Sequence, residues 1–347
     1  MIRFWLFAAV PAAAGLQWAG GPPVAVFALS LVGIFALVGV MGQATERLAA
    51  KLGPTLGGLL NATLNNLPEL IIGGVALANG FPAVVKASLT GAILANLLLG
   101  LGVALVAGGL RHGEQRFDSG RLRISSSMLM ICAFCFIVPA VFSLGTPEGT
   151  RDLSLEMSVV LVLIYLINVA AAVRTGGPAT GLVAEETFVD EHPNEPAWRS
   201  VVVLIVTAAG LGFITEIMSH ALEPTAERLG LSHTFSGLVL LGGAGSLGEV
   251  LAGTHFARKG RSSLLLAATV GSTIQMVLLV APLLVLIGQI VGQPMDLAFT
   301  SFEVVAIVLA VMITRELIQD GKANWFEGVL LVAVYAILAI GFYHLPE

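Results

Sequence analysis

Long apolar runs follow one another along almost the whole of this 347-residue chain, and they constrain its fold more than any other feature. A bilayer-spanning helix needs about 20 mainly apolar residues. Runs of that kind occupy residues 4–20, 23–43, 56–79, 82–109, 124–145, 156–173, 200–220, 235–257, 263–290, 297–314 and 325–344. Only 11% of the residues are charged, compared with about 25% in a soluble domain. We therefore expect an all-α polytopic protein with eleven transmembrane helices, surrounded by membrane lipid.

The first run is the weakest, since it is short and contains several small residues after Arg3. It is either a retained N-terminal helix or a cleaved signal peptide. The other ten runs do not depend on that choice.

The Lys and Arg residues favour one orientation, because short cytoplasmic loops hold most of the basic residues of membrane proteins. With a cytoplasmic N-terminus, the outside loops carry only Arg151 and Arg228 of the 17 basic residues, and Lys86 lies at the mouth of a span. The inside loops carry Arg3, Arg47, Lys51, Arg111, Arg116, Arg121, Arg123, Arg174, Arg199, Arg258, Lys259, Arg261, Arg315 and Lys322. We expect an integral protein of a bacterial inner membrane.

The chain also repeats itself at an offset of 180 positions. Among the matched pairs are Glu69 with Glu249, Gly57 with Gly237, Gly73 with Gly253, and Gly91 with Gly271. Each copy spans five apolar runs, and an odd number inserts the second copy upside down. Inverted repeats are typical of secondary transporters, whose binding site lies at the repeat interface. We predict an N-terminal helix (1–22), a first repeat (23–174), an acidic cytosolic linker (175–198) and a second repeat (199–347).

Two carboxylates, Glu69 and Glu249, fall near the middle of their apolar runs. A charge at the bilayer centre costs at least about 2.5 kcal/mol, so such a residue normally faces a partner or a cavity. Lys86 is the only Lys or Arg within any predicted span, and it lies near a membrane edge. The pair therefore indicates an ion site rather than a structural salt bridge.

Neutral oxygen donors surround both carboxylates in the sequence. Asn61, Asn65 and Glu69 stand four residues apart, which predicts one stripe on a helix, and Asn66 corresponds to Ser246 in the second repeat. Pro68 and the glycines before Glu249 predict loosely wound backbone. The predicted metal ligands are Glu69, Glu249, Asn66, Ser246 and Asn65, with supporting polar residues Asn96, Ser88, Ser272 and Gln275, each of which could equally serve as an interhelical hydrogen-bond partner.

Carboxylates and amide oxygens suit a divalent cation such as Ca²⁺. When no cation is bound, two like charges in a medium of low dielectric constant favour protonation. Competition between protons and metal for the same two glutamates is a coupling mechanism. Ca²⁺, or another divalent cation, and H⁺ are thus predicted as transported ions, with no permanently bound cofactor.

Other classes of function find little support. Cys132 and Cys135 lie in an apolar run, where packing is a simpler interpretation than a redox or metal pair. His255 stands alone near the end of a span. The net charge of −5 does not indicate a nucleic-acid partner. We expect no enzyme activity, and a cation channel is the distant alternative.

The motifs resemble those of the cation/proton exchanger branch of the calcium/cation antiporter superfamily. The resemblance rests on GGLLNAT (57–63), NLPELII (66–72), VVKASLTG (84–91), NLLL (96–99), GSTIQ (271–275) and VAP (280–282). It implies eleven helices, Ca²⁺/H⁺ exchange by alternating access and a site built from the two repeat glutamates. It further implies a proton-path or gating role for Glu46 and Glu216, and an acidic cytosolic helix between the halves.

Some positions depart from the pattern of that family. Asn65 stands in place of a Gly, Ser246 in place of an Asn, and Gln43 in place of a frequent Glu. Ala92 and Ala95 replace hydroxyl residues. These departures leave open a Na⁺-coupled exchanger, or one for Mn²⁺, Mg²⁺ or K⁺. The oligomeric state is likewise open.

Overall fold

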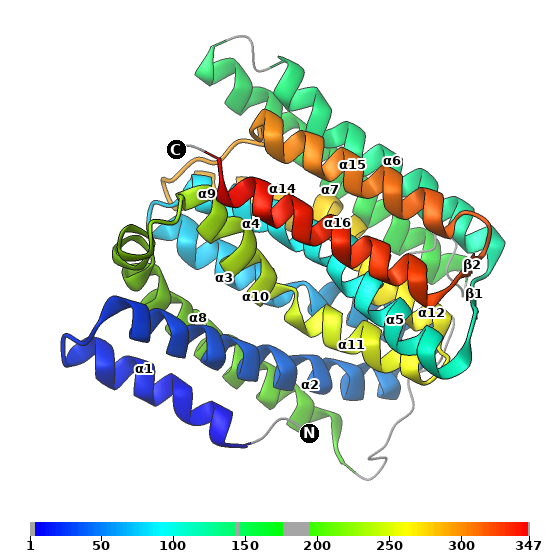
Figure 1. The fold of residues 1–347 in the computed structure, drawn as a ribbon, viewed down its shortest axis with the longest axis horizontal. Coiled ribbons are helices and arrows are strands. Elements are labelled where there is room, and N and C mark those ends of the chain that lie inside the picture. Colours follow the sequence, from blue (N-terminus) through cyan, green and yellow to red (C-terminus); the bar gives the residue numbers. More distant parts are fainter. Residues whose placement is uncertain (1–3, 143–145, 176–194, 346–347) are drawn as a thin grey trace.

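The computed structural model describes residues 4–142, 146–175 and 195–345, and these form a nearly all-helical bundle (Figure 1). The elements of the first half are η1 (Phe4–Ala8), α1 (Ala9–Trp18), α2 (Pro23–Asn65), α3 (Leu67–Ala78), α4 (Pro82–Leu94), η2 (Ala95–Gly100), α5 (Leu101–His112), β1 (Gln115–Arg116), α6 (Ser119–Phe142) and α7 (Pro147–Thr175). The expectation of a helical, polytopic chain is confirmed at this level.

The second half is interrupted more often. Its elements are α8 (Ala197–Leu229), α9 (His233–Phe235), η3 (Ser236–Gly242), α10 (Gly243–Gly245), α11 (Leu247–Arg258), α12 (Ser262–Leu266), η4 (Ala267–Gly271), α13 (Ser272–Gln275), η5 (Met276–Val280), α14 (Ala281–Ile290), α15 (Ser301–Ile318), β2 (Lys322–Ala323) and α16 (Trp325–Tyr343). The segments η2, η3, η4 and η5 are π-helical. Such segments are uncommon and are often found at functional sites.

Seven helices in the described part are long and apolar enough to cross a membrane. They are Pro23–Gly53, Pro82–His112, Leu122–Phe142, Glu148–Arg174, Ala197–Leu229, Ser262–Ile290 and Trp325–Tyr343. A bent pair, Ser236–Gly245 with Leu247–Arg258, gives an eighth if it counts as one span. Each of the eight corresponds to a predicted run.

Three predicted runs do not reach this standard. The run at 4–20 contains only the shorter apolar helix Leu6–Trp18. The run at 56–79 is divided between α2 and α3. The run at 297–314 overlaps α15, which carries three charged residues, Glu303, Arg315 and Glu316. The count of eleven therefore stays a prediction.

The helix that begins at Pro23 is longer than the predicted run at 23–43. It continues to Gly53, where the backbone kinks (φ 79°, ψ 178°), and a second helical stretch within α2 then runs to Asn65. The polar residues between 43 and 53 are good helix formers, so the helix extends beyond the apolar part. Glycine alone takes this positive φ without steric cost.

The bundle has a peripheral layer and a core. Helices α1, α2 and α8 lie together on one side of the molecule (Figure 1). Their apolar side chains, among them Ile34, Met41, Leu211 and Ile214, belong to a hydrophobic cluster separate from the main core. The main core is formed by α4, α5, α12 to α15 and their π-helical neighbours. The site described below lies where these two clusters meet.

Glycines let core helices touch through their backbones. A Cβ at Gly242 in η3 would lie 2.5 Å from the carbonyl oxygen of Ser88 in α4, and one at Gly91 would overlap the Leu238 carbonyl. A Cβ at Gly237 would lie 2.8 Å from the Val84 carbonyl oxygen. Small residues allow this approach in membrane proteins, and it holds α4 firmly against the first half of the broken helix.

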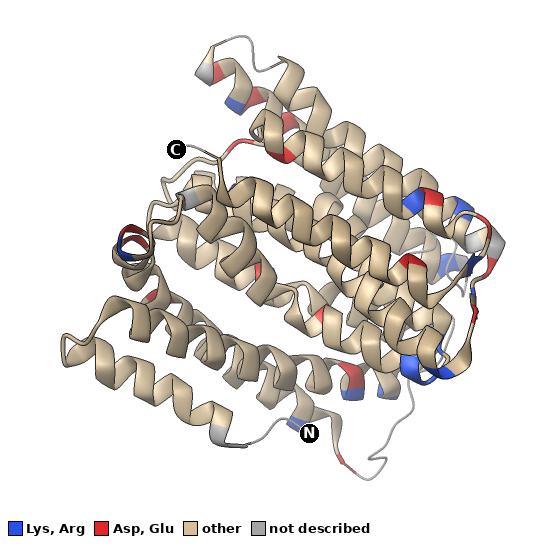
Figure 2. Cartoon of the chain, in the orientation of Figure 1, with Lys and Arg blue, Asp and Glu red and all other residues tan. Residues whose placement is uncertain are grey.

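Charged residues gather at the ends of the bundle, and most Lys and Arg lie toward one end (Figure 2). At that basic end, β1 and β2 pair antiparallel, with Gln115 opposite Ala323 and Arg116 opposite Lys322. Of the predicted acidic linker, Glu195 is described and lies 3.6 Å from Arg47, whereas residues 176–194 lie outside the described part.

Candidate cation-binding site

Two helices break at positions 180 residues apart. Asn66 (φ −90°, ψ 6°) separates α2 from α3, and Ser246 (φ −78°, ψ 0°) separates α10 from α11. The second pair bends by 49°. Glu69 and Glu249 therefore occupy the first turns of α3 and α11, where the partial positive charge of a helix N-terminus favours a carboxylate. Pro68 in the first turn of α3 suits this start, because the amide hydrogen it lacks has no partner there.

The two carboxylates are buried and lie close enough to interact with each other. Neither oxygen of Glu69 accepts a hydrogen bond from a donor group of the described residues. Two ionised carboxylates cannot donate to one another. A proton or a cation between them would therefore relieve the repulsion.

A third buried carboxylate, Glu303, provides a contrast. Its Oε2 accepts hydrogen bonds from the Thr300 backbone N–H (2.9 Å) and hydroxyl (2.8 Å), and its Oε1 accepts one from the Thr90 hydroxyl (3.4 Å). This is a capping box at the start of α15. Lys86 is likewise satisfied elsewhere, 3.0 Å from Asp296, so it does not neutralise the glutamate pair.

A hydrogen-bond network joins Asn66 to the second half of the chain. The Asn66 amide donates to Gln275 Oε1 at 3.0 Å and to the Ala62 carbonyl at 3.1 Å. Ser272 Oγ lies 3.0 Å from Asn66 Oδ1 and 3.4 Å from Glu249 Oε1, and can donate to either. Ser272 and Gln275 belong to α13, a single turn between η4 and η5. The network thus fixes the side chains of Asn66, Ser272 and Gln275 relative to Glu249.

The network is one-sided. The positions equivalent to Ser272 and Gln275 in the first half are Ala92 and Ala95, which have no polar side chain to offer Glu69. Ser246 is fully buried and donates to the Ala92 carbonyl at 3.4 Å. Glu249 therefore has a hydroxyl partner, while Glu69 has none among the described residues.

The remaining supporting residues are placed differently. Ser88 donates to the Val85 carbonyl of its own helix at 2.9 Å. Asn96 is the second residue of the π-helical segment η2 and is fully buried, and neither amide atom has a hydrogen-bond partner among the described residues. Segment η2 packs against α11 and η4. Asn96 is thus a buried amide beside the helix that carries Glu249.

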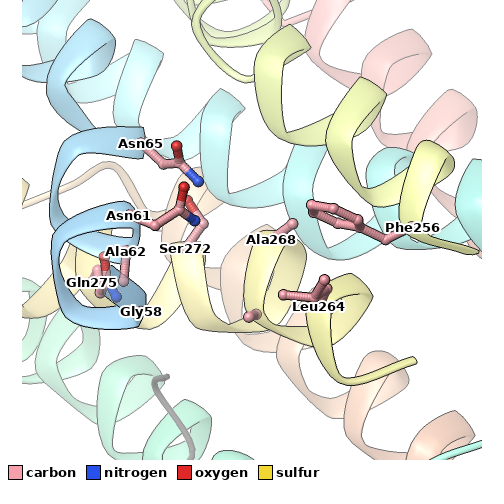
Figure 3. A pocket seen from close by; sticks show the side chains of 10 residues that line it. Gly58, Asn61, Ala62, Asn65, Phe256, Leu264, Ala268, Ser272 and Gln275 are labelled. Carbon is pink, nitrogen blue, oxygen red and sulfur yellow. The ribbon is translucent and has the colours of Figure 1, made fainter. Parts of the chain in front are cut away.

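A cavity lies beside the glutamates and is lined by Gly58, Asn61, Ala62, Asn65, Phe256, Leu264, Ala267, Ala268, Ser272 and Gln275 (Figure 3). The predicted stripe of Asn61, Asn65 and Glu69 on one helix is wrong, because the helix breaks at Asn66. Asn61 and Asn65 line the cavity, and Glu69 lies with Glu249 on the other side of the network.

Glu46 and Glu216 lie on the peripheral helices α2 and α8. Glu216 is half-exposed, and its Oε2 accepts a hydrogen bond from the Asn79 side chain at 2.7 Å. His220 lies 3.3 Å from its Oε1. Glu46 is half-buried within α2.

Sequence reasoning missed three features of this site. The π-helical segments have no periodicity that distinguishes them from α-helix. Pairing of Asn66 with Gln275 joins residues 209 apart, and only the repeat offset hinted that these segments meet. The contact of Asn79 with Glu216 had no signal at all.

The donor set fits a hard cation. No cluster of three or more His, Cys, Asp or Glu side chains that could hold a metal occurs in the described part. Two carboxylates with neutral amide and hydroxyl oxygens would leave room for water ligands, which Ca²⁺ accepts readily.

Comparison with known proteins gives consistent matches. The sodium/calcium exchanger protein family matches this chain twice, over residues 22–174 and over residues 199–343. A Ca²⁺/H⁺ antiporter of Aphanothece halophytica is 35% identical, covering 99% of this chain and 97% of that protein. The Ca²⁺/H⁺ antiporter ChaA of Bacillus subtilis is 37% identical, covering 93% of each.

Solved structures resemble this fold over nearly its whole length. The Ca²⁺/H⁺ antiporter protein YfkE is 33% identical, with a TM-score of 0.86 over 98% of both chains. An H⁺/Ca²⁺ exchanger, CAX, is 18% identical, with a TM-score of 0.76 over 98% of this chain and 92% of that one. At that identity the second likeness concerns the fold alone. The resemblance seen in the sequence is confirmed by these matches.

Proposed function

The chain belongs to the sodium/calcium exchanger protein family, and on that basis we propose that it exchanges Ca²⁺ for protons across a membrane. The observation that carries the proposal is the pair Glu69 and Glu249, two buried carboxylates that lie close together with no Lys or Arg of the described residues to neutralise them. Relatives that are at least 35% identical over almost the whole chain are Ca²⁺/H⁺ antiporters, which supports Ca²⁺ as cargo and protons as the counter-ion.

In this mechanism the two glutamates alternate between protons and metal. Ca²⁺ entering the site takes the carboxylates together with oxygens from Asn66, Ser246 and the supporting residues, and displaces protons. On the other side of the membrane, protons displace the metal. Because the charged pair is unfavourable when empty, the site changes sides either protonated or loaded, which couples the two flows.

The finer architecture belongs to the same proposal. Eleven helices form two inverted repeats of five and one N-terminal helix, and the double match of one family to residues 22–174 and 199–343 supports the division. The basic end of the bundle faces the cytoplasm of a bacterial cell, in accord with the positive-inside rule. Movement of α2 and α8 against the core gates the site, with Glu46 and Glu216 on the proton path.

The test is Ca²⁺ uptake into inside-out membrane vesicles with an imposed pH gradient. We expect uptake by the natural chain and none by Glu69→Gln or Glu249→Gln, since an amide cannot exchange a proton with the cation. Glu303→Gln is the matched control, because its amide oxygen can still accept the hydrogen bonds from Thr300.

Uptake unaffected by both substitutions would refute the site. Uptake driven by a Na⁺ gradient and not by a pH gradient would instead identify a Na⁺-coupled exchanger. A competition series with Mn²⁺, Mg²⁺ and K⁺ ranks the cargo.

A further inference from the structure

The cavity lined by Asn61 and Asn65 adjoins the glutamate pair, but neither carboxylate lines it. Figure 3 shows both amide groups directed toward Ser272, from successive turns of the last part of α2. Asn61 Oδ1 is buried and has no hydrogen-bond partner among the described residues. A buried amide oxygen without a partner is unfavourable by about 1–3 kcal/mol, so the cavity has an acceptor that a ligand could satisfy.

The cavity adjoins the glutamate pair through two side chains. Ser272 and Gln275 line it, and the same residues contact Glu249 and Asn66 at 3.4 Å and 3.0 Å. A cation in the cavity is thus separated from Glu249 by one hydroxyl group. The negative charge of the carboxylates attracts cations toward this position.

The cavity lies toward the basic end of the molecule. Its wall includes Phe256, near the end of α11, and Leu264, in the first turn of α12. Arg258 ends α11, and the turn that follows contains Lys259 and Arg261. In the orientation proposed above, the cavity is therefore on the cytosolic side of the glutamates.

We propose that this cavity is a second cation site, at which a partly hydrated divalent cation is held by the amide oxygens of Asn61 and Asn65 before it reaches Glu69 and Glu249. All of its side-chain ligands are neutral, so it binds Ca²⁺ more weakly than the carboxylate pair and passes the ion on. The cation/proton exchangers that this sequence resembles usually have glycine at the position of Asn65. The Asn65 amide is therefore a feature of this chain. The proposal rests on the proposed cation transport.

The kinetic test measures initial Ca²⁺ uptake against Ca²⁺ concentration on the cytosolic face. For Asn61→Ala/Asn65→Ala we expect KM to rise about tenfold, the effect of losing about 1.4 kcal/mol of binding, with a maximal rate changed by less than about twofold. Thr63→Val is the matched control. Thr63 lies between the two asparagines on the same helix, but its hydroxyl bonds to the Leu59 carbonyl and to Tyr165 and does not line the cavity.

The structural test uses Glu69→Gln/Glu249→Gln, in which the carboxylate pair is removed. Crystals soaked in Sr²⁺ should show anomalous scattering in the cavity, within about 2.6 Å of an asparagine oxygen. An unchanged KM, or a cavity without scattering, overturns the proposal. Natural protein that takes up no Ca²⁺ refutes the proposed function instead, and Sr²⁺ scattering then still decides whether the cavity binds a divalent cation.

Discussion

At the scale of single residues, the two glutamates are chemically equal in the sequence and unequal in the structure. Ser272 offers a hydroxyl to Glu249, whereas Ala92, at the equivalent position, offers nothing to Glu69. Glu69 has no hydrogen-bond partner among the described residues. The proposed site therefore has one carboxylate with a hydroxyl beside it and one without.

The substitution Ser272→Ala tests this inequality. It removes the hydroxyl that lies 3.4 Å from Glu249 Oε1 and 3.0 Å from Asn66 Oδ1, and a hydrogen bond of this kind is worth about 0.5–1.5 kcal/mol. The donors around Glu249 are then held less firmly, and the Ca²⁺ concentration for half-maximal uptake should rise by about two- to tenfold. Uptake across a Ca²⁺ series checks this result. Ser158→Ala, which removes a buried hydroxyl from α7, should leave that concentration unchanged.

At the scale of elements, broken helices and close backbone contacts shape the site. The breaks at Asn66 and Ser246 place both glutamates at helix N-termini. Contact between η3 and α4 through Gly91 and Gly242 fixes one of the broken helices against the core. The position of Ser246 depends on that contact, because Ser246 bonds to the Ala92 carbonyl on the same helix.

We predict that Gly242→Ala separates these two helices. Its Cβ would meet the backbone of Ser88 at 2.5 Å and of Ala92 at 2.8 Å, and overpacking of this kind costs about 1–3 kcal/mol. Lower thermal stability and loss of Ca²⁺ uptake are the expected results. Gly74→Ala is the control, since a Cβ there meets nothing within 4 Å and alanine favours helix by up to about 1 kcal/mol. Equal stability in the two variants would contradict this account of the contact.

At the scale of the whole molecule, the two ends of the bundle differ. The cavity beside the glutamates lies toward the basic end. Toward the other end, Asn79 at the end of α3 holds Glu216 of α8, with His220 next to it. The peripheral helix is thus tied to the core at one end, while a cavity approaches the site from the other.

The alternating access proposed above requires α8 to move away from α3 at the end where Asn79 and Glu216 lie. In a Cys132→Ala/Cys135→Ala background, we predict that Asn79→Cys/His220→Cys, joined by a short bifunctional thiol reagent, blocks exchange and that reduction of the cross-link restores it. Glu216 is retained in this design. Each single cysteine variant treated with the reagent is the control. Exchange that continues in the cross-linked protein would refute movement of α8 against α3.

The sequence by itself determined the apolar segments, the repeat offset and the identity of the two carboxylates, because hydropathy and the scarcity of charge report which residues face lipid and which exceptions need a reason. It also predicted loosely wound backbone at Pro68 and before Glu249, where the helices break. It did not predict the one-sided network of Asn66, Ser272 and Gln275, or the hydrogen bond between Asn79 and Glu216. Those features join residues more than a hundred positions apart. Only the packing of helices decides them, because the spacing of polar residues along a helix is the same whether their side chains line a cavity or bond to a distant segment.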